Sequence, residues 1–379
     1  MADALVLGAG IMGLSAAWGL LRAGHSVTVV EQDAVPNPRG SSVDEHRLIR
    51  HAYGAAAGYM RMVDDAYAAW DLLWQELGEV PYARTGVLAL GDGGAGWLDE
   101  SRATLRGAGH PVRDLGAADL ATHFPMIRAA DLDDAFHMAE GGVLLAGRIV
   151  TLLAAHLRQR GVGFIRGRAT AVDPARAVLV LEDGRTLQAG RLVLAAGPWA
   201  PRLIPGLSAR VTPSRQIVVY LEPPPQHRAA WAAAPMILDL SAAGGFYAVP
   251  PVQGTRLKIG DHRFSCHGDA EDPREALAAE AEAILELARP RLRDAESYRV
   301  LEARACYYDV EPEERFVVEP VGERCVVMSG FSGHGFKFGA VLGLAVGAWD
   351  LRALPGWAAG QGGAAPVGTI PAMSGPTLR

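Results

Sequence analysis

Lysine is one of the residues that this sequence nearly lacks. Only two of its 36 basic residues are lysines, Lys258 and Lys337, and the others are arginines. Arginine presents a planar fork that stays protonated, whereas lysine presents a compact ammonium on a flexible stem that fits tighter spaces and titrates more readily. Survival by chance is the simplest alternative, but apolar residues and glycines surround both lysines, in Leu257-Lys258-Ile259-Gly260 and in Gly335-Phe336-Lys337-Phe338. We therefore interpret both as site residues.

Three further shortages narrow the class of protein. The three cysteines, Cys266, Cys306 and Cys325, have no paired spacing, which indicates a reducing compartment rather than a disulfide framework. No stretch reaches the roughly 18 apolar residues of a membrane span, and we see no signal peptide. The net charge of −6 argues against nucleic acid and anionic membranes as partners. From the cysteines and the lack of a membrane span or signal peptide we predict a cytoplasmic protein. Because the histidines show no ligand spacing with the cysteines, we predict no metal site.

The N-terminal segment carries the clearest local motif. A strand over residues 4–7 ends in a glycine-rich turn at Gly8, Gly10 and Gly13, and a helix to Arg22 and a strand over 26–30 follow, ending at Glu31. Such glycines let the backbone approach a pyrophosphate at the positive end of the helix, and the acid accepts hydrogen bonds from a ribose. Because two strands flank the motif and an acid follows it, the segment predicts a dinucleotide site. An acid at Glu31 suits an unphosphorylated ribose, which favours FAD or NAD over NADP.

The remaining chain does not continue as a regular strand–helix series. With 379 residues, half of them apolar, two domains are expected. Hydrophobic periodicity predicts helices over 59–77, 149–160, 273–288 and 337–351, and strands over 85–90, 163–165, 177–181, 192–195, 215–221, 245–249, 257–260 and 325–329. Gly339, Gly343 and Gly347 lie four residues apart, which predicts a helix face that another backbone can approach closely.

Five segments together resemble one known family. Gly8 to Gly13 with Glu31 resembles the FAD-binding opening of the glutathione-reductase-like flavoproteins. The other four segments resemble monomeric sarcosine oxidase and N-methyltryptophan oxidase, in the D-amino-acid-oxidase superfamily. They are 47–53 (RLIRHAY), Tyr247 with 257–262 (LKIGDH), 306–308 (CYY) and 330–338 (GFSGHGFKF). The resemblance covers nearly the whole chain in order, and it is most specific around Lys337.

The resemblance implies a mixed α/β fold of two domains. The first is an interrupted glutathione-reductase-like FAD-binding domain, over residues 1–84, 145–210 and 306–358. The second is a substrate domain with a mixed, largely antiparallel sheet, over 85–144 and 211–305. Residues 359–379, rich in glycine, alanine and proline, are expected to form a mobile tail.

The resemblance also implies FAD bonded covalently through its 8α-methyl to the sulfur of Cys306, because a cysteine followed two residues later by tyrosine carries that bond in the family. It implies that the residues around FAD are Gly8, Gly10, Ile11, Met12, Gly13, Glu31, Gln32, Ser41, Ser42, Arg47, Ala169, Ala196, Gly197, Trp199, Cys306, Tyr308, Gly333, His334, Gly335, Phe336 and Lys337.

Four further roles come from the same resemblance. Lys258 matches the lysine that activates oxygen. A unit charge about 4 Å from a developing anion is worth about 4 kcal/mol at an effective dielectric constant near 20, or about a thousandfold in rate. Arg50 and Lys337 match the pair that holds the substrate carboxylate. Arg47 matches the arginine beside the flavin, and Tyr247 and His262 match residues of the substrate cavity, where they assist catalysis or binding.

The implied activity is a monomeric FAD-dependent oxidase of secondary amines that carry a carboxylate, such as sarcosine. A hydride equivalent passes to flavin N5, an imine forms, and O2 is reduced to H2O2. Three alternatives stay open: an oxidase of pipecolate, proline or a piperideine carboxylate, a dehydrogenase with another electron acceptor, and a non-catalytic FAD-binding scaffold. The chain departs from the family at the acidic 43–46 segment (VDEH), at Asp261 and at Tyr307, which bear on the substrate rather than on the cofactor.

Overall fold

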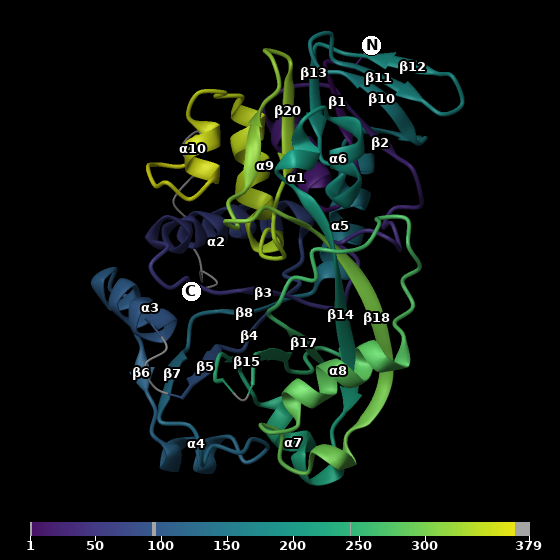
Figure 1. Ribbon diagram of the computed structural model, residues 1–379. Helices are drawn as coiled ribbons and strands as arrows, with labels where there is room; N and C mark the ends of the chain where they lie inside the picture. Colours follow the sequence, from purple (N-terminus) through teal and green to yellow (C-terminus); the bar gives the residue numbers. More distant parts are fainter. Residues whose placement is uncertain (1, 93–95, 243, 368–379) are drawn as a thin grey trace.

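The computed structural model describes residues 2–92, 96–242 and 244–367, and it has two halves that share long strands (Figure 1). A six-stranded sheet organises the first half. Its strands, in spatial order, are β19 (Val317–Pro320), β20 (Cys325–Ser329), β13 (Arg191–Leu194), β1 (Ala4–Leu7), β2 (Val27–Glu31) and β9 (Gly163–Arg166). All neighbouring pairs are parallel except β19 with β20. The four residues of β1 are buried, as expected for a parallel strand covered on both faces.

Further helices accompany α1 (Ile11–Arg22) in this half of the molecule. They are α2 (Ala57–Leu77), α5 (Ala146–Gln159), α6 (Ala200–Leu203), α9 (Gly339–Ala348) and α10 (Leu354–Ala358). The predicted glycine face is confirmed: a Cβ on Gly343 would collide with the Ser15 carbonyl oxygen, and one on Gly347 would collide with Gly19. Backbone-to-backbone contact of α1 and α9 therefore fixes the start of α1 behind the glycine-rich turn.

An eight-stranded mixed sheet organises the second half. Its order is β18 (Arg299–Val310), β14 (Thr212–Glu222), β17 (Leu257–Asp261), β16 (Phe246–Val249), β15 (Met236–Asp239), β5 (Val87–Gly91), β7 (Asp134–Met138) and β6 (Arg113–Asp114). Only β15 and β5 pair in parallel. The helices of this half are α3 (Gly96–Gly107), α4 (Ala117–His123), α7 (Arg228–Ala232) and α8 (Ala278–Ala288). The long strands β14 and β18 extend toward the first half (Figure 1).

Two small antiparallel sheets complete the fold. One joins β3 (Arg47–Ile49), β8 (Gly142–Leu144) and β4 (Tyr82–Arg84), and it positions the segment that contains Arg47 and Arg50. The other joins β10 (Ala169–Asp173), β11 (Val178–Leu181) and β12 (Thr186–Gln188). No helix among the described residues combines the length and the apolar character required to cross a membrane.

The expected mixed α/β fold is confirmed, with local differences. The helix expected over 273–288 begins only at Ala278, because the preceding residues lie against β18, where Glu275 bridges Arg304. The helix expected over 337–351 is a 3-10 turn, Phe336–Phe338, followed by α9, which stops at Ala348 before Trp349 with φ of 55°.

The expected domain boundary at residue 306 falls inside β18, whose last residues pair with the start of β14. Of the tail expected from residue 359, Ala365 and Val367 pack against the core of the first half. Residues 368–379 lie outside the described residues.

Candidate active site

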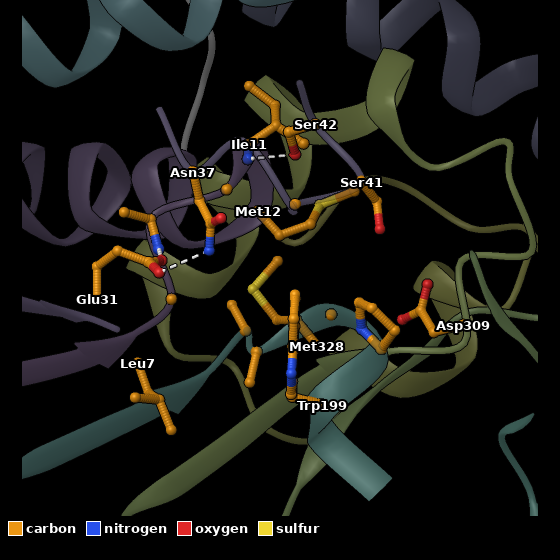
Figure 2. Close-up of a pocket in the computed structure, with 18 of the residues that line it drawn as sticks. Leu7, Ile11, Met12, Glu31, Asn37, Ser41, Ser42, Trp199, Asp309 and Met328 are labelled. Carbon is orange, nitrogen blue, oxygen red and sulfur yellow. Dashed lines mark hydrogen bonds between the residues drawn. The ribbon is translucent and has the colours of Figure 1, made fainter. Parts of the chain in front are cut away.

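A cavity of about 320 Å³ lies at the carboxyl ends of β1, β2 and β13 (Figure 2). The carboxyl edge of a parallel sheet is where such folds bind ligands. The residues expected around FAD that line it are Gly8, Gly10, Ile11, Met12, Glu31, Gln32, Ser41, Ser42, Arg47, Ala169, Ala196, Gly197, Trp199, Tyr308, Gly333, Gly335 and Phe336. The structure thus gathers segments that are up to about three hundred residues apart in the sequence.

The turn before α1 has the geometry of an anion cradle. Gly8 has φ of 103°, and a Cβ there would collide with the Ala195 carbonyl oxygen, so glycine is required. Gly10 has no side chain to cap α1, and a Cβ on it would lie 3.1 Å from Ser42 Oγ. Ser42 Oγ accepts the Ile11 N–H at 2.9 Å. Ser42 satisfies the Ile11 N–H, and the positive end of α1 still faces the cavity, so these residues fit the diphosphate of FAD.

Glu31 lies buried at the end of β2, beside the cavity. Its carboxylate accepts the Ala9 N–H at 2.8 Å and the Asn37 side-chain N–H at 2.9 Å. Burial raises the pKa of Glu31, and these hydrogen bonds oppose that rise. Oε1 also accepts the Asp33 N–H at 3.1 Å, which with Asn37 uses both of its lone pairs. A ribose hydroxyl would therefore donate to Oε2, the oxygen that accepts the Ala9 N–H.

Four residues expected around FAD do not line this cavity. A Cβ on Gly13 would collide with the Gly8 carbonyl oxygen, so Gly13 allows α1 to pack on the turn. His334 and Lys337 line a second cavity. Cys306 is buried on β18, two residues before Tyr308, so both side chains leave the same face of the strand. The distance from Cys306 Sγ to Arg47 Nη2 is 3.9 Å.

The second cavity has a volume of about 360 Å³ and shares Arg47, Tyr308, Gly333 and Phe336 with the first. The two spaces therefore adjoin. Every residue expected at the substrate or in catalysis lines the second cavity, namely Arg47, Arg50, Tyr247, Lys258, His262 and Lys337. Apolar walls come from Leu48, Trp97, Leu238, Leu240 and Phe264.

Two cations meet in this cavity. Lys337 is 4% exposed, and its ammonium donates to Tyr53 Oη at 2.8 Å and to the His334 carbonyl at 2.9 Å. Arg50 lies over the Tyr53 ring at 5.0 Å, and within the described part of the chain its buried Nη1 has no hydrogen-bond partner. Burial, followed by repulsion from Arg50, holds the pKa of Lys337 well below its ordinary value. An anion between the two groups would reduce the repulsion between Arg50 and Lys337 and would give Arg50 Nη1 a hydrogen-bond partner.

Lys258 is 2% exposed and has a partner that the sequence analysis missed. Its ammonium donates to Asp44 Oδ2 at 2.9 Å and to the His46 carbonyl at 3.0 Å. Arg47 and the hydroxyl of Tyr220 also donate to Asp44. Burial would raise the pKa of Asp44, but the charges of Lys258 and Arg47 outweigh it and hold the pKa far below its ordinary value. The unusual acidity of the 43–46 segment was the sequence feature that could have indicated Asp44 as this partner.

Tyr247 and His262 form one wall, with ring centroids 5.8 Å apart. A ring nitrogen of His262 lies 3.1 Å from the Phe246 carbonyl oxygen. Asp261 also lines this cavity, and burial raises its pKa.

Asp309, which the sequence analysis missed, lines the first cavity and accepts the Gly330 N–H at 2.9 Å, so it orders the glycine-rich loop before Lys337.

Comparisons with known proteins identify the family and the fold. A model of the family described as FAD dependent oxidoreductase matches residues 3–349. N-methyl-L-tryptophan oxidase of Yersinia pestis (strain Pestoides F) is 29% identical over 346 residues, covering 90% of this chain and 92% of that protein.

Solved structures share the fold at low identity. L-proline dehydrogenase from P. horikoshii has a TM-score of 0.78 at 17% identity and covers 93% of both chains. NikD, an amino acid oxidase of nikkomycin biosynthesis, has a TM-score of 0.78 at 20% identity, covering 92% of this chain and 93% of its own.

Proposed function

Because the chain belongs to the family of FAD-dependent oxidoreductases, as its motifs predicted, we propose that it oxidises a small amino acid whose nitrogen is a secondary amine. The substrate is N-methylated or cyclic, and O2 is the electron acceptor. When bound, FAD accepts a hydride equivalent from the carbon next to the substrate nitrogen and passes the electrons on. The protein is expected to act as a monomer in the cytoplasm.

Arg50 and Lys337 carry this proposal. They lie in the cavity that adjoins the dinucleotide cavity, and Arg50 Nη1 is buried without a partner among the described residues. An arginine fork and an ammonium together hold a carboxylate firmly and fix its orientation. The substrate carbon that reacts would then be presented at the junction of the two cavities, where Arg47, Tyr308, Gly333 and Phe336 form the shared wall.

We further propose that FAD is bonded to Cys306. The Arg47 guanidinium, which lines both cavities, lies 3.9 Å from the Cys306 sulfur. Tyr308, on the same face of β18, lines both cavities, which supports a location of this part of the strand beside FAD. Protein precipitated with acid should stay yellow, and the peptide that contains Cys306 should gain the mass of one FAD. Complete release of flavin from the wild-type protein would contradict the bond.

A dehydrogenase that uses a quinone or a protein acceptor is the second candidate. One observation favours it: Asp44 bonds directly to Lys258 and partly neutralises the cation that would assist oxygen reduction. The two candidates differ only in the acceptor. Substrate-reduced protein should be reoxidised rapidly by air in the first case and only by an added dye or quinone in the second.

The test is a screen with two readouts, peroxide formation and dye reduction. Sarcosine, N-methyl-L-tryptophan, proline and pipecolate of both hands are supplied, together with N-methyltryptamine as an amine without a carboxylate. Bleaching of the flavin by any amino acid excludes a scaffold role. Efficient oxidation of N-methyltryptamine would show that Arg50 and Lys337 do not select a carboxylate.

The clamp itself is tested with the Lys337→Met variant. Removing one partner of a buried charged group costs about 2–5 kcal/mol. Binding of simple carboxylate inhibitors should therefore weaken by roughly 30-fold or more, at 1.4 kcal/mol per tenfold. Binding is read from the flavin spectrum, and unchanged inhibitor affinity would rule the clamp out.

A further inference from the structure

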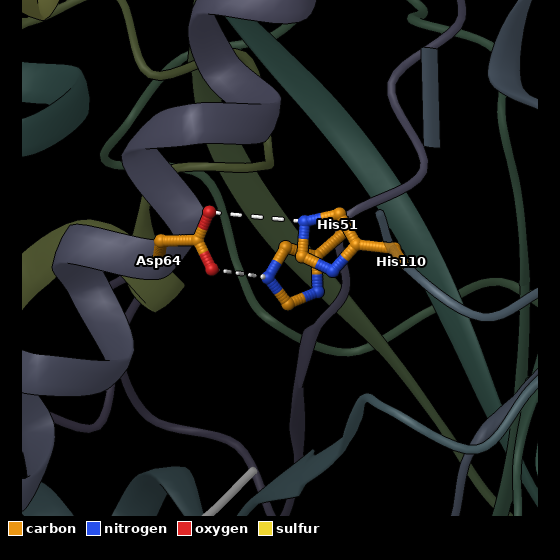
Figure 3. Close-up of side chains that lie close together, drawn as sticks. All are labelled: His51, Asp64 and His110. Atoms are coloured by element: carbon orange, nitrogen blue, oxygen red, sulfur yellow. Dashed lines mark ion pairs between the residues drawn. The ribbon is translucent and has the colours of Figure 1, made fainter. Parts of the chain in front are cut away.

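Four titratable side chains from four segments meet next to Arg50, outside both cavities. Figure 3 shows three of them, His51, Asp64 and His110, with Asp64 facing both imidazole rings. His51 follows Arg50, Asp64 lies on α2, and His110 follows α3. The fourth, Glu140, lies between β7 and β8.

The two imidazoles lie between the two carboxylates. Asp64 Oδ1 is 3.4 Å from His51 Nε2, and Asp64 Oδ2 is 3.7 Å from His110 Nε2. On the opposite edge, Glu140 Oε2 is 3.0 Å from His110 Nδ1 and 4.0 Å from His51 Nδ1. The ring centroids of the two histidines are 4.2 Å apart.

His51 is the unusual member of this group. It is 1% exposed, it stacks on Tyr67 with ring centroids 5.4 Å apart, and neither of its ring nitrogens has a hydrogen-bond partner in the described chain. Leaving buried polar atoms unsatisfied costs about 1–3 kcal/mol each. The ring is nevertheless held with Nε2 3.4 Å from Asp64 Oδ1, an orientation in which both atoms could bind one metal ion.

We propose that His51, Asp64 and His110 bind a divalent transition-metal ion of the Zn²⁺ class. One donor atom from each of the three lies within 4.8 Å of the others. Zinc bonds imidazole nitrogen and carboxylate oxygen at about 2.0–2.2 Å, so small side-chain rotations would close the site. Two imidazoles with one carboxylate are a set that suits zinc and its neighbours in the first transition row.

Glu140 completes the arrangement. When it accepts the Nδ1 proton of His110, the Nε2 lone pair is left facing Asp64, where two acceptors would repel each other without a cation between them. Asp64 is 33% exposed and His110 is 11% exposed, so an ion can reach the site from solvent. A bound ion would link α2 to the segment after α3. It would also fix the position of His51, which follows Arg50 in the sequence.

The rival explanation is that the four side chains contact only one another and bind no ion. The experiment uses FAD-loaded protein without a histidine tag, stripped with a chelator and titrated with Zn²⁺ alone. Calorimetry gives affinity and stoichiometry, elemental analysis gives the bound metal, and the thermal midpoint is measured with and without Zn²⁺. The variants are His110→Ala, Asp64→Asn and Glu140→Gln, and the matched control is His123→Ala, an exposed histidine at the end of α4.

The wild type and His123→Ala should bind one Zn²⁺ per chain and show a higher thermal midpoint that the chelator reverses. His110→Ala and Asp64→Asn should lose at least tenfold in affinity, and Glu140→Gln should lose about tenfold to a hundredfold, as is typical when the partner of a ligand is removed. X-ray absorption of the bound zinc should show imidazole and oxygen ligands without sulfur, a readout that does not depend on any variant folding. No binding, equal binding by all variants, or sulfur ligation would overturn the proposal.

Discussion

A buried lysine serves as a cation only while it keeps its proton, and the carboxylate of Asp44 helps Lys258 to keep it. Burial lowers the pKa of Lys258, and the carboxylate of Asp44 at 2.9 Å opposes that loss. The same contact reduces the positive field that Lys258 offers to an oxygen anion. If Lys258 activates oxygen, as proposed, the strength of that effect depends on a balance between retention of the Lys258 proton and neutralisation of its charge by Asp44.

Replacing Lys258 removes the cation without changing the substrate clamp. In Lys258→Met, reoxidation of the reduced cofactor by O2 should slow by about two to three orders of magnitude, from the effect of a unit charge about 4 Å away at a dielectric constant near 20. Stopped-flow measurement separates this step from anaerobic reduction by substrate, which should change far less. Lys337→Met, at the only other lysine, is the matched control and should affect substrate binding instead. Equal slowing of both steps in Lys258→Met would make Lys258 a positioning residue.

Replacing Asp44 changes the pH at which Lys258 loses its proton. The carboxylate raises the pKa of Lys258, so Asp44→Asn should lower that pKa further below its ordinary value of 10.5. Oxygen reactivity that depends on protonated Lys258 is present below the pKa and lost as pH rises through it. The variant should therefore lose reoxidation rate at a lower pH than the wild type, as followed by stopped flow across the alkaline range.

Glu45→Gln is the control for that experiment, because the Glu45 carboxylate bonds Arg256 at 2.6 Å rather than Lys258. Its pH profile should match that of the wild type. A profile of Asp44→Asn that coincides with the wild type would mean that the ionisation of Lys258 does not govern the oxygen step.

At the scale of elements, two features hold the cofactor region in register. β18 pairs with β14 over nearly its full length and brings Tyr308 to the junction of the two cavities, with Cys306 buried two residues before it on the same face of the strand. α9 packs against α1, whose N-terminus faces the cavity for the diphosphate. Periodicity in the sequence predicted the glycine face of α9, but it did not predict β18, whose first half is exposed and contains charged residues.

A side chain at Gly343 should separate these helices. In Gly343→Val the added carbons would collide with the Ser15 backbone, and overpacking of this kind lowers the free energy of unfolding by about 1–3 kcal/mol. Denaturation in urea at a fixed flavin content measures the change. Gly107→Ala, in the last turn of α3 where a Cβ has nothing within 4 Å, should be neutral or stabilise by up to about 1 kcal/mol. Equal stability of Gly343→Val and the wild type would show that the helices tolerate separation.

For the whole molecule, the sequence predicted best what local motifs determine. Backbone requirements predicted the turn from Gly8 to Gly13, and the rarity of lysine singled out Lys258 and Lys337. The mixed fold and the other expected residues of the second cavity came from the resemblance to a known family. The pairing of Asp44 with Lys258 could not be predicted, since it joins a loop to β17 across more than two hundred residues. The cluster of His51, Asp64 and His110 was not predicted either, because its three residues lie in separate segments and show no metal-ligand spacing in the sequence.

The cofactor cavity is lined by segments from Leu7 to Phe336, so FAD binding should stabilise the molecule as a whole. If Cys306 carries the bond, the wild type contains its FAD permanently, and added FAD should not shift its thermal midpoint. Cys306→Ala should instead bind FAD reversibly, and its midpoint should rise with FAD concentration, by the equivalent of about 2.7 kcal/mol at a hundredfold excess over the Kd. Cys266→Ala, at an exposed cysteine, is the matched control and should behave like the wild type. A concentration-dependent midpoint in wild-type protein would mean that FAD is bound only by non-covalent contacts.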